Sequence, residues 1–290
     1  GVDNLNDYYN YSLKKDRCDL LKQLGIDFIN QDINNLEIKN KKFDLLINLA
    51  AQAGVRVSNE NEYLYEYTNV KGFENICRFS QENDIKKIIY ASSSSVYDDK
   101  DTEIFSEGVT KLSPKSKYGQ SKLRNELFAQ SNYKKFDISF IGLRFFSVYG
   151  PFGRPDMAYF KFTDAISKQE ELILNNEGKM KRDMTYIDDV VNGIMLSINY
   201  ISSRLGCFHE IFNLGNGKPI MTSELLKIIE RMLGKNATIS NQKTKNESLF
   251  TNADIKKSQT LLGYDPKISI DSGIDQFIKW YKEYEKQKKH

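Results

Sequence analysis

The sequence is poor in cysteine, has no surplus of either charge and contains no long apolar run. Its three cysteines, Cys18, Cys77 and Cys207, are odd in number and have no metal-type spacing, which argues against a disulfide scaffold and favours a reduced, cytoplasmic protein. Lys and Arg number 42 and Asp and Glu 39, so the formal net charge of +3 indicates neither a nucleic-acid nor a membrane partner. An anionic small molecule would have to be bound by local arginines.

The apolar stretches are too short for a membrane-spanning helix or a signal peptide. The longest, FDLLINLAAQAGV at 43–55, is interrupted by Asp44, Asn48 and Gln52. With 290 residues, 40% of them hydrophobic and 28% charged, the chain has the composition of a soluble globular protein of one or two domains. We expect a cytoplasmic protein without a metal site.

Short apolar runs alternate with longer segments of helical period, as is typical of an α/β protein with a parallel sheet between helices. The candidate strands are residues 25–32, 43–50, 86–93, 138–146 and 209–215, and the clearest candidate helices are 62–83 and 118–136. The alternation loosens after Gly150, where GPFGRPDMAYF holds two of the five prolines. We therefore expect one domain at 1–146 and a smaller lobe at 147–290, with some segments of the lobe returning to the first domain.

Tyr118 and Lys122 lie one helical turn apart, so their side chains share a helix face. The same spacing occurs four times, at Tyr11/Lys15, Tyr67/Lys71, Tyr118/Lys122 and Tyr284/Lys288. Only the third pair follows an apolar strand that ends in a hydroxyl cluster, IIYASSSSVYD at 88–98. Because open α/β sheets place their sites at the carboxyl ends of strands, this pair and the serines form the candidate site.

At these residues the sequence resembles the extended short-chain dehydrogenase/reductase family of nucleotide-sugar enzymes, and most closely its UDP-glucuronate 4-epimerases. The matching motifs, in family order, are GVDNLNDYY, NLAAQAGVR, YASSSSVY, SKYGQSK, LRFFSVYGPFGRPDMAYFKF, GKMKRDMTYIDDV and NLGN. The resemblance implies a Rossmann-like, doubly wound parallel sheet with NAD in domain 1–146 and a UDP-sugar in lobe 147–290. It also implies a homodimer formed through the two helices at 63–83 and 118–134.

In that family Tyr118 would exchange a proton with the sugar 4-hydroxyl while hydride passes between C4 and NAD. A phenol has a pKa of about 10, so the Lys122 ammonium and the nicotinamide charge would have to lower it. Ser93 would share the 4-oxygen in a short hydrogen bond, with Ser94 beside the substrate. Serine at positions 94 and 95 replaces the carboxylates that related dehydratases and decarboxylases carry, which favours an epimerase.

The resemblance places the substrate on Ser147, Arg154 and Arg182. Arg154 would hold the C6 carboxylate of UDP-glucuronate in its guanidinium fork, and Arg182 the diphosphate. Holding the carboxylate would also protect the 4-keto intermediate, a β-keto acid that loses CO2 when its carboxylate turns perpendicular to the ketone plane. The alternatives are an Arg154 paired with a surface carboxylate, and an epimerase of another UDP-hexose or UDP-uronic acid. The uridine contacts in 240–252 stay open.

The cofactor contacts implied by the resemblance begin with Asp3 and Asn4, which would read the ribose and favour NAD over NADP. The remaining implied contacts, on the adenine, along the nicotinamide path and at the catalytic pair, are Asp32, Ile33, Leu49, Ala50, Ala51, Asn69, Tyr118, Lys122 and Phe145. Two further expectations concern the lobe. Asp188 and Asp189 are expected to cap a following helix rather than to act in catalysis, and the tail at 281–290 to be a frayed helix end.

The glycine-rich phosphate turn of a dinucleotide-binding domain is expected about 20 residues before the ribose-binding acid. With Asp3 in that role, the turn, the first strand and the first helix fall before residue 1. Because the first strand is central, the second and fourth strands would have unpaired edges. Either the sequence omits a segment of the natural protein, which we prefer, or the chain is truncated. A truncated chain would be a UDP-sugar-binding remnant without activity.

Overall fold

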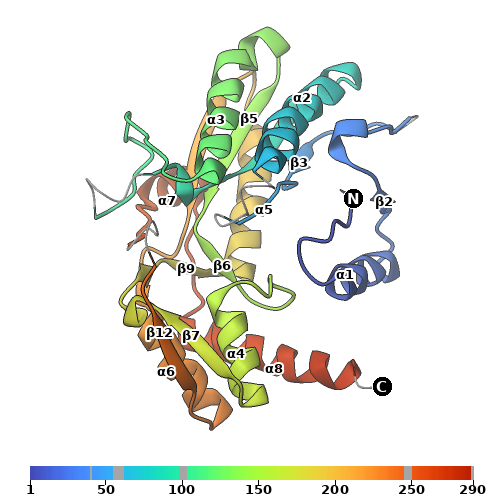
Figure 1. The fold of residues 1–290 in the computed structure, drawn as a ribbon. Helices are drawn as coiled ribbons and strands as arrows, with labels where there is room; N and C mark the ends of the chain where they lie inside the picture. The colour runs from blue at the N-terminus through green and yellow to red at the C-terminus, as the bar shows by residue number, and fades with distance from the viewer. Residues whose placement is uncertain (40, 55–61, 98–102, 245–249, 289–290) are drawn as a thin grey trace. The chain divides into compact units, whose positions relative to one another are not determined.

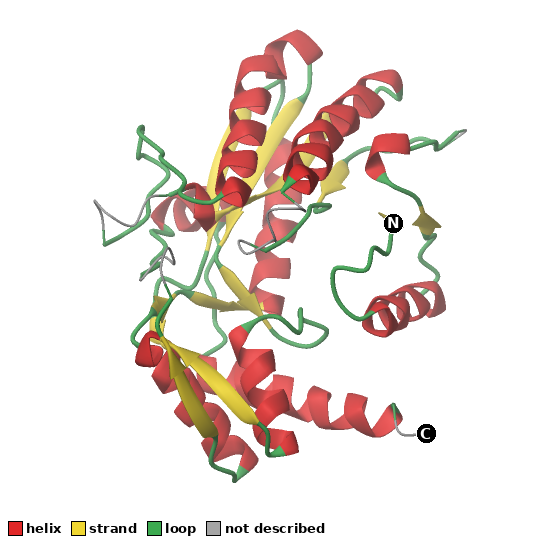
Figure 2. Ribbon diagram, in the orientation of Figure 1, coloured by secondary structure: helices red, strands yellow, loops and turns green. Residues whose placement is uncertain are grey.

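The structure is a computed structural model that describes residues 1–39, 41–54, 62–97, 103–244 and 250–288. It divides into two compact units, shown as ribbons in Figure 1 and by secondary structure in Figure 2. The first unit comprises 1–98, 107–145 and 194–213, and the second 99–106, 146–193 and 214–290. None of the helices in the described residues is long and apolar enough to cross a membrane.

The first unit contains a four-stranded sheet in the order β10-β5-β4-β3. Its strands are β3 (Leu46–Asn48), β4 (Lys87–Ser93), β5 (Ser139–Phe145) and β10 (His209–Leu214). The first three run parallel. The apolar side chains of β4 and β5 are buried on both faces, as the continuous hydrophobic runs predict for a parallel sheet covered by helices. The predicted Rossmann-like α/β class is confirmed.

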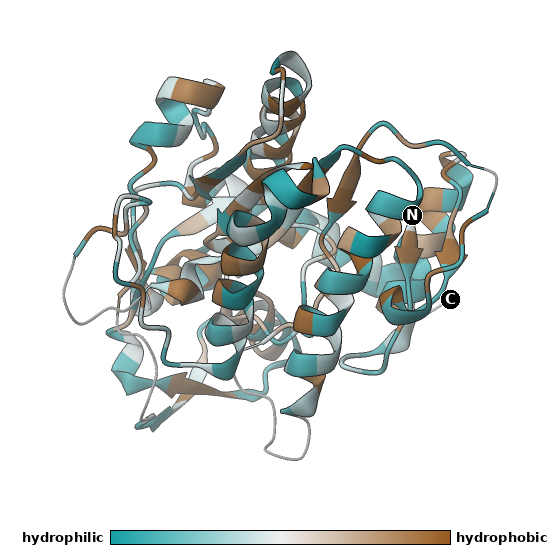
Figure 3. Ribbon diagram, turned by 90° about the horizontal axis from the view of Figure 1, so that it is seen from above, coloured by the Kyte–Doolittle hydropathy of each residue, from teal (hydrophilic) through white to brown (hydrophobic). Residues whose placement is uncertain are grey.

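Helices α2 (Gly72–Glu82) and α3 (Lys117–Phe136) lie side by side over this sheet (Figure 1). Phe73 of α2 packs against Phe128 of α3 with ring centroids 6.0 Å apart, and also against Tyr90 of β4 at 5.0 Å. Hydrophobic and hydrophilic residues are interspersed along the helices (Figure 3), as expected of helices with one buried and one exposed face.

The predicted helix at 62–83 begins differently from a regular α-helix. Residues Tyr65–Lys71 form a π-helix, η3, that continues directly into α2. Over only seven residues, hydrophobic periodicity does not separate these two helix types, because the wider turn of a π-helix shifts the apolar face only slightly. π-helices are rare and are frequently found at functional sites, which draws attention to Asn69 within this one.

The N-terminal segment forms a separate small sheet. Strands β1 (Val2–Asp3) and β2 (Ile29–Asn30) pair in parallel, with α1 (Tyr11–Gln23) between them and the 3₁₀ turn η1 (Ile33–Asn35) after them. The predicted strand at 25–32 is therefore only two residues long. In the described residues β1 pairs with β2 alone, and β3 is an edge strand whose Ile47 is 39% exposed.

The second unit is built from three strand pairs and several helices. The pairs are β6 (Ser147–Tyr149) with β9 (Met184–Tyr186), β7 (Glu171–Asn175) with β12 (Thr238–Gln242), and β8 (Lys181–Arg182) with β11 (Ile220–Met221). The helical elements are α4 (Ala158–Lys168), η5 (Asn176–Gly178), α5 (Ile187–Ser203), α6 (Thr222–Leu233), α7 (Lys256–Leu262) and α8 (Ile270–Gln287). Helix α5 begins in this unit and ends in the first.

An aromatic core holds α8 in the second unit. Tyr159 and Phe277 make an edge contact at 4.7 Å, and Trp280 stacks on Tyr284 at 5.0 Å. Tyr281 and Tyr284 are only 3% and 6% exposed. The tail at 281–290 ends the last helix, as expected, but it is not frayed from residue 281: apolar burial keeps α8 helical as far as Gln287, and residues 289–290 lie outside the described part of the chain.

Candidate active site

The hydroxyl cluster lies at the carboxyl end of β4, as predicted. Ser93 is the last residue of β4 and is 8% exposed. Its Oγ accepts the backbone N–H of Ser95 at 3.1 Å and so caps the 3₁₀ turn η4 (Ser94–Val96). Ser94 is half-buried. The capping bond fixes the direction of the Ser93 hydroxyl, which suits a group that orients a ligand oxygen rather than one that ionises.

Helix α3 begins against this serine turn. The Ser116 hydroxyl caps the helix by accepting the N–H of Gly119 at 3.0 Å. A Cβ at Gly119 would lie only 2.2 Å from the carbonyl oxygen of Ser95, so only glycine permits this approach. The first turn of α3, which carries Tyr118, is thereby packed directly on the turn that follows Ser93.

Lys122 lies one turn further along α3 and is buried under Tyr118. It is 2% exposed, its Nζ donates to the carbonyl oxygen of Ala91 at 2.9 Å, and Nζ is 5.8 Å from the centroid of the Tyr118 ring. Burial lowers the pKa of Lys122 to about 8, so the ammonium still predominates at pH 7. A positive charge at this position favours the phenolate form of Tyr118.

Replacement of Lys122 by methionine is expected to raise stability at neutral pH in the cofactor-free protein. In the unfolded chain a lysine titrates near pH 10.5, whereas in the fold its pKa is about 8. The folded protein therefore binds fewer protons between these values, and wild-type stability rises with pH there. We expect Lys122→Met to gain about 1–3 kcal/mol at pH 7 and to lose this advantage towards pH 10.5. Urea unfolding of both proteins across this range is the measurement; an advantage that grows with pH would contradict the assignment.

The next residue on the same face of α3, Glu126, forms a buried ion pair with Arg144. Glu126, one turn beyond Lys122, accepts from Nε and Nη2 of Arg144 at 2.8 and 2.7 Å and from Ser92 Oγ at 2.5 Å. Arg144 Nη1 donates to the Tyr97 hydroxyl at 2.7 Å. The pair joins α3 to the strands that end at the site, since Ser92 of β4 and Arg144 of β5 are neighbours in the sheet. The sequence analysis did not predict the Glu126–Arg144 ion pair. The spacing of four residues from Tyr118 to Lys122 and from Lys122 to Glu126 already placed Glu126 on the same face of α3.

Asn69 of the π-helix connects three segments. Its Oδ1 accepts the N–H of Gln52 at 2.7 Å, and its Nδ2 donates to the Gln52 carbonyl at 3.2 Å and to Ser121 Oγ at 2.9 Å. Asn69 and Gln52 are 1% and 3% exposed. The segment after β3, the π-helix and α3 are therefore held together one residue from Lys122.

Most of the expected cofactor residues lie at or just after the ends of four strands of the first unit, β1, β2, β3 and β5. Asn4 Nδ2 donates to Asp32 Oδ2 at 2.9 Å, and the other Asp32 oxygen accepts the N–H of Asn34 at 2.9 Å. Asp3 accepts the N–H of Leu5 at 2.7 Å and stays exposed. Ile33 is buried next to these, Leu49, Ala50 and Ala51 follow β3, and Phe145 ends β5.

The expected substrate residues Ser147, Arg154 and Arg182 belong to the second unit. Arg154 makes a two-pronged ion pair with Asp156, with Nε–Oδ1 2.9 Å and Nη2–Oδ2 3.0 Å. Arg182 lies on β8 and donates to the Lys181 carbonyl at 3.1 Å. Ser147 begins β6, where its N–H donates to the Asp183 carbonyl at 3.0 Å. The backbone thus brings Ser147 next to the Arg182–Asp183 segment.

Asp189, in the first turn of α5, has a structural role that differs from the expected cap. The carboxylate of Asp189 accepts the backbone N–H groups of Lys267 and Ile268 at 3.0 and 2.9 Å, and so ties α5 to the segment before α8. The expected cap of α5 itself is wrong for Asp189, because its two oxygens accept hydrogen bonds from this distant segment.

Among the described residues no group of three or more His, Cys, Asp or Glu could hold a metal ion.

Comparison with known proteins gives concordant results. Residues 1–215 match the NAD dependent epimerase/dehydratase family. An uncharacterised protein of Methanocaldococcus jannaschii is 43% identical over 98% of this chain and 87% of its own length. A UDP-glucuronate 4-epimerase of Arabidopsis thaliana is 38% identical over 98% of this chain and 69% of its own. The structure of UDP-glucuronic acid 4-epimerase from Bacillus cereus, in complex with UDP-glucuronic acid and NAD, has a TM-score of 0.88 at 29% identity, over 98% of this chain and 90% of that one.

The parallel sheet, with a serine at the end of one strand and a Tyr-Lys pair on the helix that packs beside it, is the arrangement expected of the Rossmann-like enzymes that the sequence resembles. The chain belongs to the NAD dependent epimerase/dehydratase family. The resemblance seen in the sequence motifs is thereby confirmed.

Proposed function

We propose that this protein interconverts UDP-glucuronate and UDP-galacturonate by inverting C4 of the sugar with the help of NAD. The observation that carries the proposal is Tyr118, positioned by Gly119 against the serine turn and lying above a buried lysine. The relatives of known name support the substrate, because the Arabidopsis protein and the Bacillus structure are both called UDP-glucuronate 4-epimerases.

Tyr118, Lys122 and Ser93, all in the first unit, have separate roles in this reaction. Tyr118 takes the proton of the 4-hydroxyl as C4 is oxidised and returns it when C4 is reduced from the other face. Lys122 supplies the positive charge that favours the phenolate. Ser93 binds the 4-oxygen, because its hydroxyl is already fixed by the N–H of Ser95. NAD, when bound, supplies the acceptor and donor of the hydride.

The residues present fit this cofactor. Asp3 is exposed at the end of β1, where its carboxylate suits the ribose hydroxyls of NAD and would repel the additional phosphate of NADP. The Lys122 ammonium has three N–H donors, and its hydrogen-bond acceptor in the described part of the chain is Ala91. The nicotinamide ribose would satisfy the other donors of this buried cation.

The substrate assignment is tested with Arg154→Gln. A charge-assisted bond to the C6 carboxylate contributes about 1.5–3 kcal/mol, so KM for UDP-glucuronate is expected to rise about 10- to 100-fold. UDP-glucose, which has no carboxylate, is the control substrate and its kinetics should change little. Steady-state kinetics with both substrates is the measurement. An unchanged preference for UDP-glucuronate would show that Arg154 does not bind the carboxylate.

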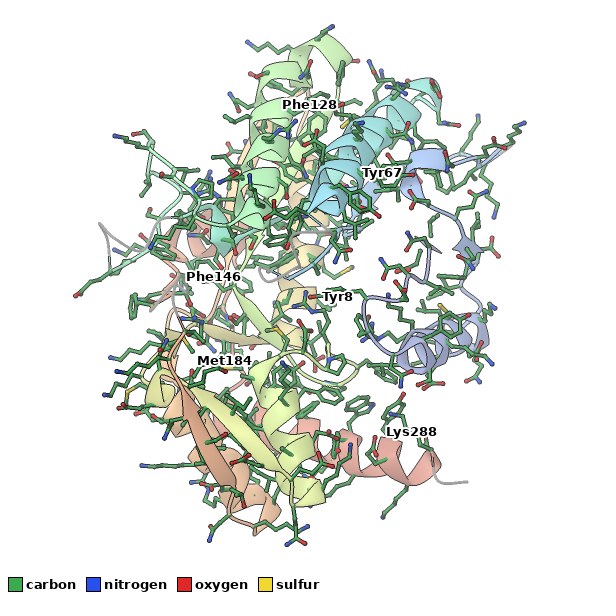
Figure 4. All side chains as sticks on the ribbon, in the orientation of Figure 1. Tyr8, Tyr67, Phe128, Phe146, Met184 and Lys288 are labelled. Carbon is green, nitrogen blue, oxygen red and sulfur yellow. The ribbon has the colours of Figure 1, made fainter. Side chains whose placement is uncertain are left out.

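We also propose a homodimer formed through the two helices at 63–83 and 118–134. Exposed apolar side chains on these helices support it, namely Tyr63, Tyr67 and Leu127 at 63, 39 and 57% exposure; Tyr67 is labelled in Figure 4. Light scattering should give twice the mass of one chain, and the mass of a single chain would contradict the dimer.

The cytoplasmic location stays a prediction that cell fractionation can test.

A further inference from the structure

The loop that carries Arg154 is firmly held within the second unit. The N–H of Gly153 donates to the Gly150 carbonyl at 3.2 Å and closes a turn after β6. A Cβ at Gly153 would lie 1.6 Å from the Tyr159 hydroxyl, so the loop lies directly on that buried ring. Phe152 packs on Trp280 of α8, with ring centroids 5.0 Å apart. The backbone on either side of Arg154 therefore has little freedom to move.

Asp156 fixes the side chain of Arg154 on this backbone. Its two oxygens accept from Nε and Nη2 at 2.9 and 3.0 Å, and the two side chains are 35% and 30% exposed. Two parallel bonds place the guanidinium and the carboxylate in one plane, which a single bond would not do. Because both residues belong to the same short loop, the pair sets the orientation of the guanidinium relative to the backbone of the second unit.

We infer that Asp156 is a positioning residue that holds the Arg154 guanidinium in the plane in which it receives the sugar carboxylate, and thereby suppresses loss of CO2 during epimerisation. This inference rests on the proposed function. A guanidinium that is fixed in one plane restricts the carboxylate that it binds to the same plane. Without Asp156 the guanidinium loses its two-pronged, planar partner and keeps a weak bond from Nη2 to Met157 Sδ at 3.5 Å, which does not fix its plane, so a bound carboxylate can turn with it.

Rotation matters because the 4-keto sugar is a β-keto acid. When the carboxylate turns perpendicular to the ketone plane, the electron pair of the C5–C6 bond overlaps with the carbonyl. The bond then breaks: CO2 leaves, the electron pair forms an enolate with C4 and its oxygen, and C5 takes a proton from water. The product is a UDP-4-keto-pentose. Epimerisation and CO2 loss therefore compete for one intermediate, and their ratio reports how firmly the carboxylate is held.

The test compares Asp156→Asn and Asp156→Ala with wild type and with Asp275→Asn. Asp275 pairs with Lys279 at 2.7 Å in the same unit, so it controls for the removal of one paired surface carboxylate. The purified proteins receive UDP-glucuronate labelled at C6, and released CO2 is measured against UDP-galacturonate formed. We expect the CO2 fraction to rise about tenfold in both Asp156 variants, with KM changed much less, and to stay at the wild-type value in Asp275→Asn.

An unchanged CO2 fraction in both Asp156 variants would overturn the inference. A lower KM with an unchanged CO2 fraction would also overturn it, because Asp156 would then be a competitor that the substrate displaces. Arg154→Gln separates this failure from that of the proposed function. If Arg154→Gln abolishes the preference for UDP-glucuronate over UDP-glucose, the substrate assignment stands whatever the Asp156 variants do. If Arg154→Gln keeps the preference while wild type forms UDP-galacturonate, Arg154 does not bind the carboxylate and the inference fails alone. If wild type forms no UDP-galacturonate, the proposed function fails together with the inference.

Discussion

Tyr118→Phe is expected to lower kcat about a hundred- to ten-thousandfold, because it removes the group that exchanges a proton with the 4-hydroxyl. Phenylalanine keeps the ring that lies 6.1 Å from Tyr65 and over Lys122, so packing at the start of α3 is preserved. The affinity for UDP-glucuronate should change little, since the carboxylate and diphosphate contacts assigned to Arg154 and Arg182 remain. A loss in kcat without a matching loss in binding identifies an interaction made only in the transition state.

The matched control is Tyr11→Phe. Tyr11 and Lys15 have the same spacing as Tyr118 and Lys122, but Tyr11 is 52% exposed at the start of α1. Helix α1 carries none of the residues assigned to the candidate site, so kcat should not change. Turnover is measured with UDP-glucuronate, and binding with isothermal calorimetry. If Tyr118→Phe kept more than about a tenth of the wild-type kcat, proton transfer would have to be assigned to another group.

The sequence predicted the parts of the site that depend on local order. The apolar run at 86–93 predicted a buried strand, and the structure has β4 there. The helical period from residue 118 predicted a helix with Tyr118 and Lys122 on one face, and the structure has α3 there. Burial of Lys122 and the lowering of its pKa did not follow from spacing. Four pairs share that spacing, and only the fold decides which of the four lysines is enclosed.

Local sequence patterns could not predict the contacts between segments that are distant in the sequence. The bond between Asn69 and Ser121 joins residues 52 positions apart, and that between Asp189 and Ile268 joins residues 79 apart. A helix cap for Asp189 was a reasonable local prediction, but the carboxylate satisfies backbone groups that tertiary packing brings to it. The frayed tail failed for the same reason, because Tyr284 packs not only on Trp280 of its own helix but also on Phe152, which lies far away in the sequence.

Glu126→Gln is expected to lower the free energy of unfolding by about 3–5 kcal/mol, because it leaves the Arg144 guanidinium buried without a counter-charge. Glu126 and Arg144 are 5% and 4% exposed, so water cannot replace the lost partner. Glutamine has almost the same shape, but one of its two acceptor oxygens becomes an NH2 that would face the N–H groups of Arg144 or the Ser92 hydroxyl. Glu177→Gln is the control, since Glu177 pairs with Lys179 on the surface and should unfold like wild type.

The double variant Glu126→Met with Arg144→Met distinguishes the cost of an unpaired charge from the value of the pair. Two apolar side chains of similar length leave no buried charge, so most of the stability lost in Glu126→Gln should return. Urea unfolding of the single and double variants measures this. If Glu126→Gln were as stable as wild type, Arg144 would have found another partner and the pair would not be what joins α3 to the strands.

The kcat of the double variant tests whether the Glu126–Arg144 pair also positions the residues of the candidate site. Ser92 precedes Ser93 on β4, and Glu126 follows Lys122 by one turn of α3, so the Glu126–Ser92 bond joins the two elements of the candidate site just below the reacting groups. A double variant that regains stability but not kcat would show that this bond positions Tyr118 relative to Ser93. Recovery of both would mean that packing of α3 on β4 alone suffices, and that the ion pair serves the fold rather than the reaction.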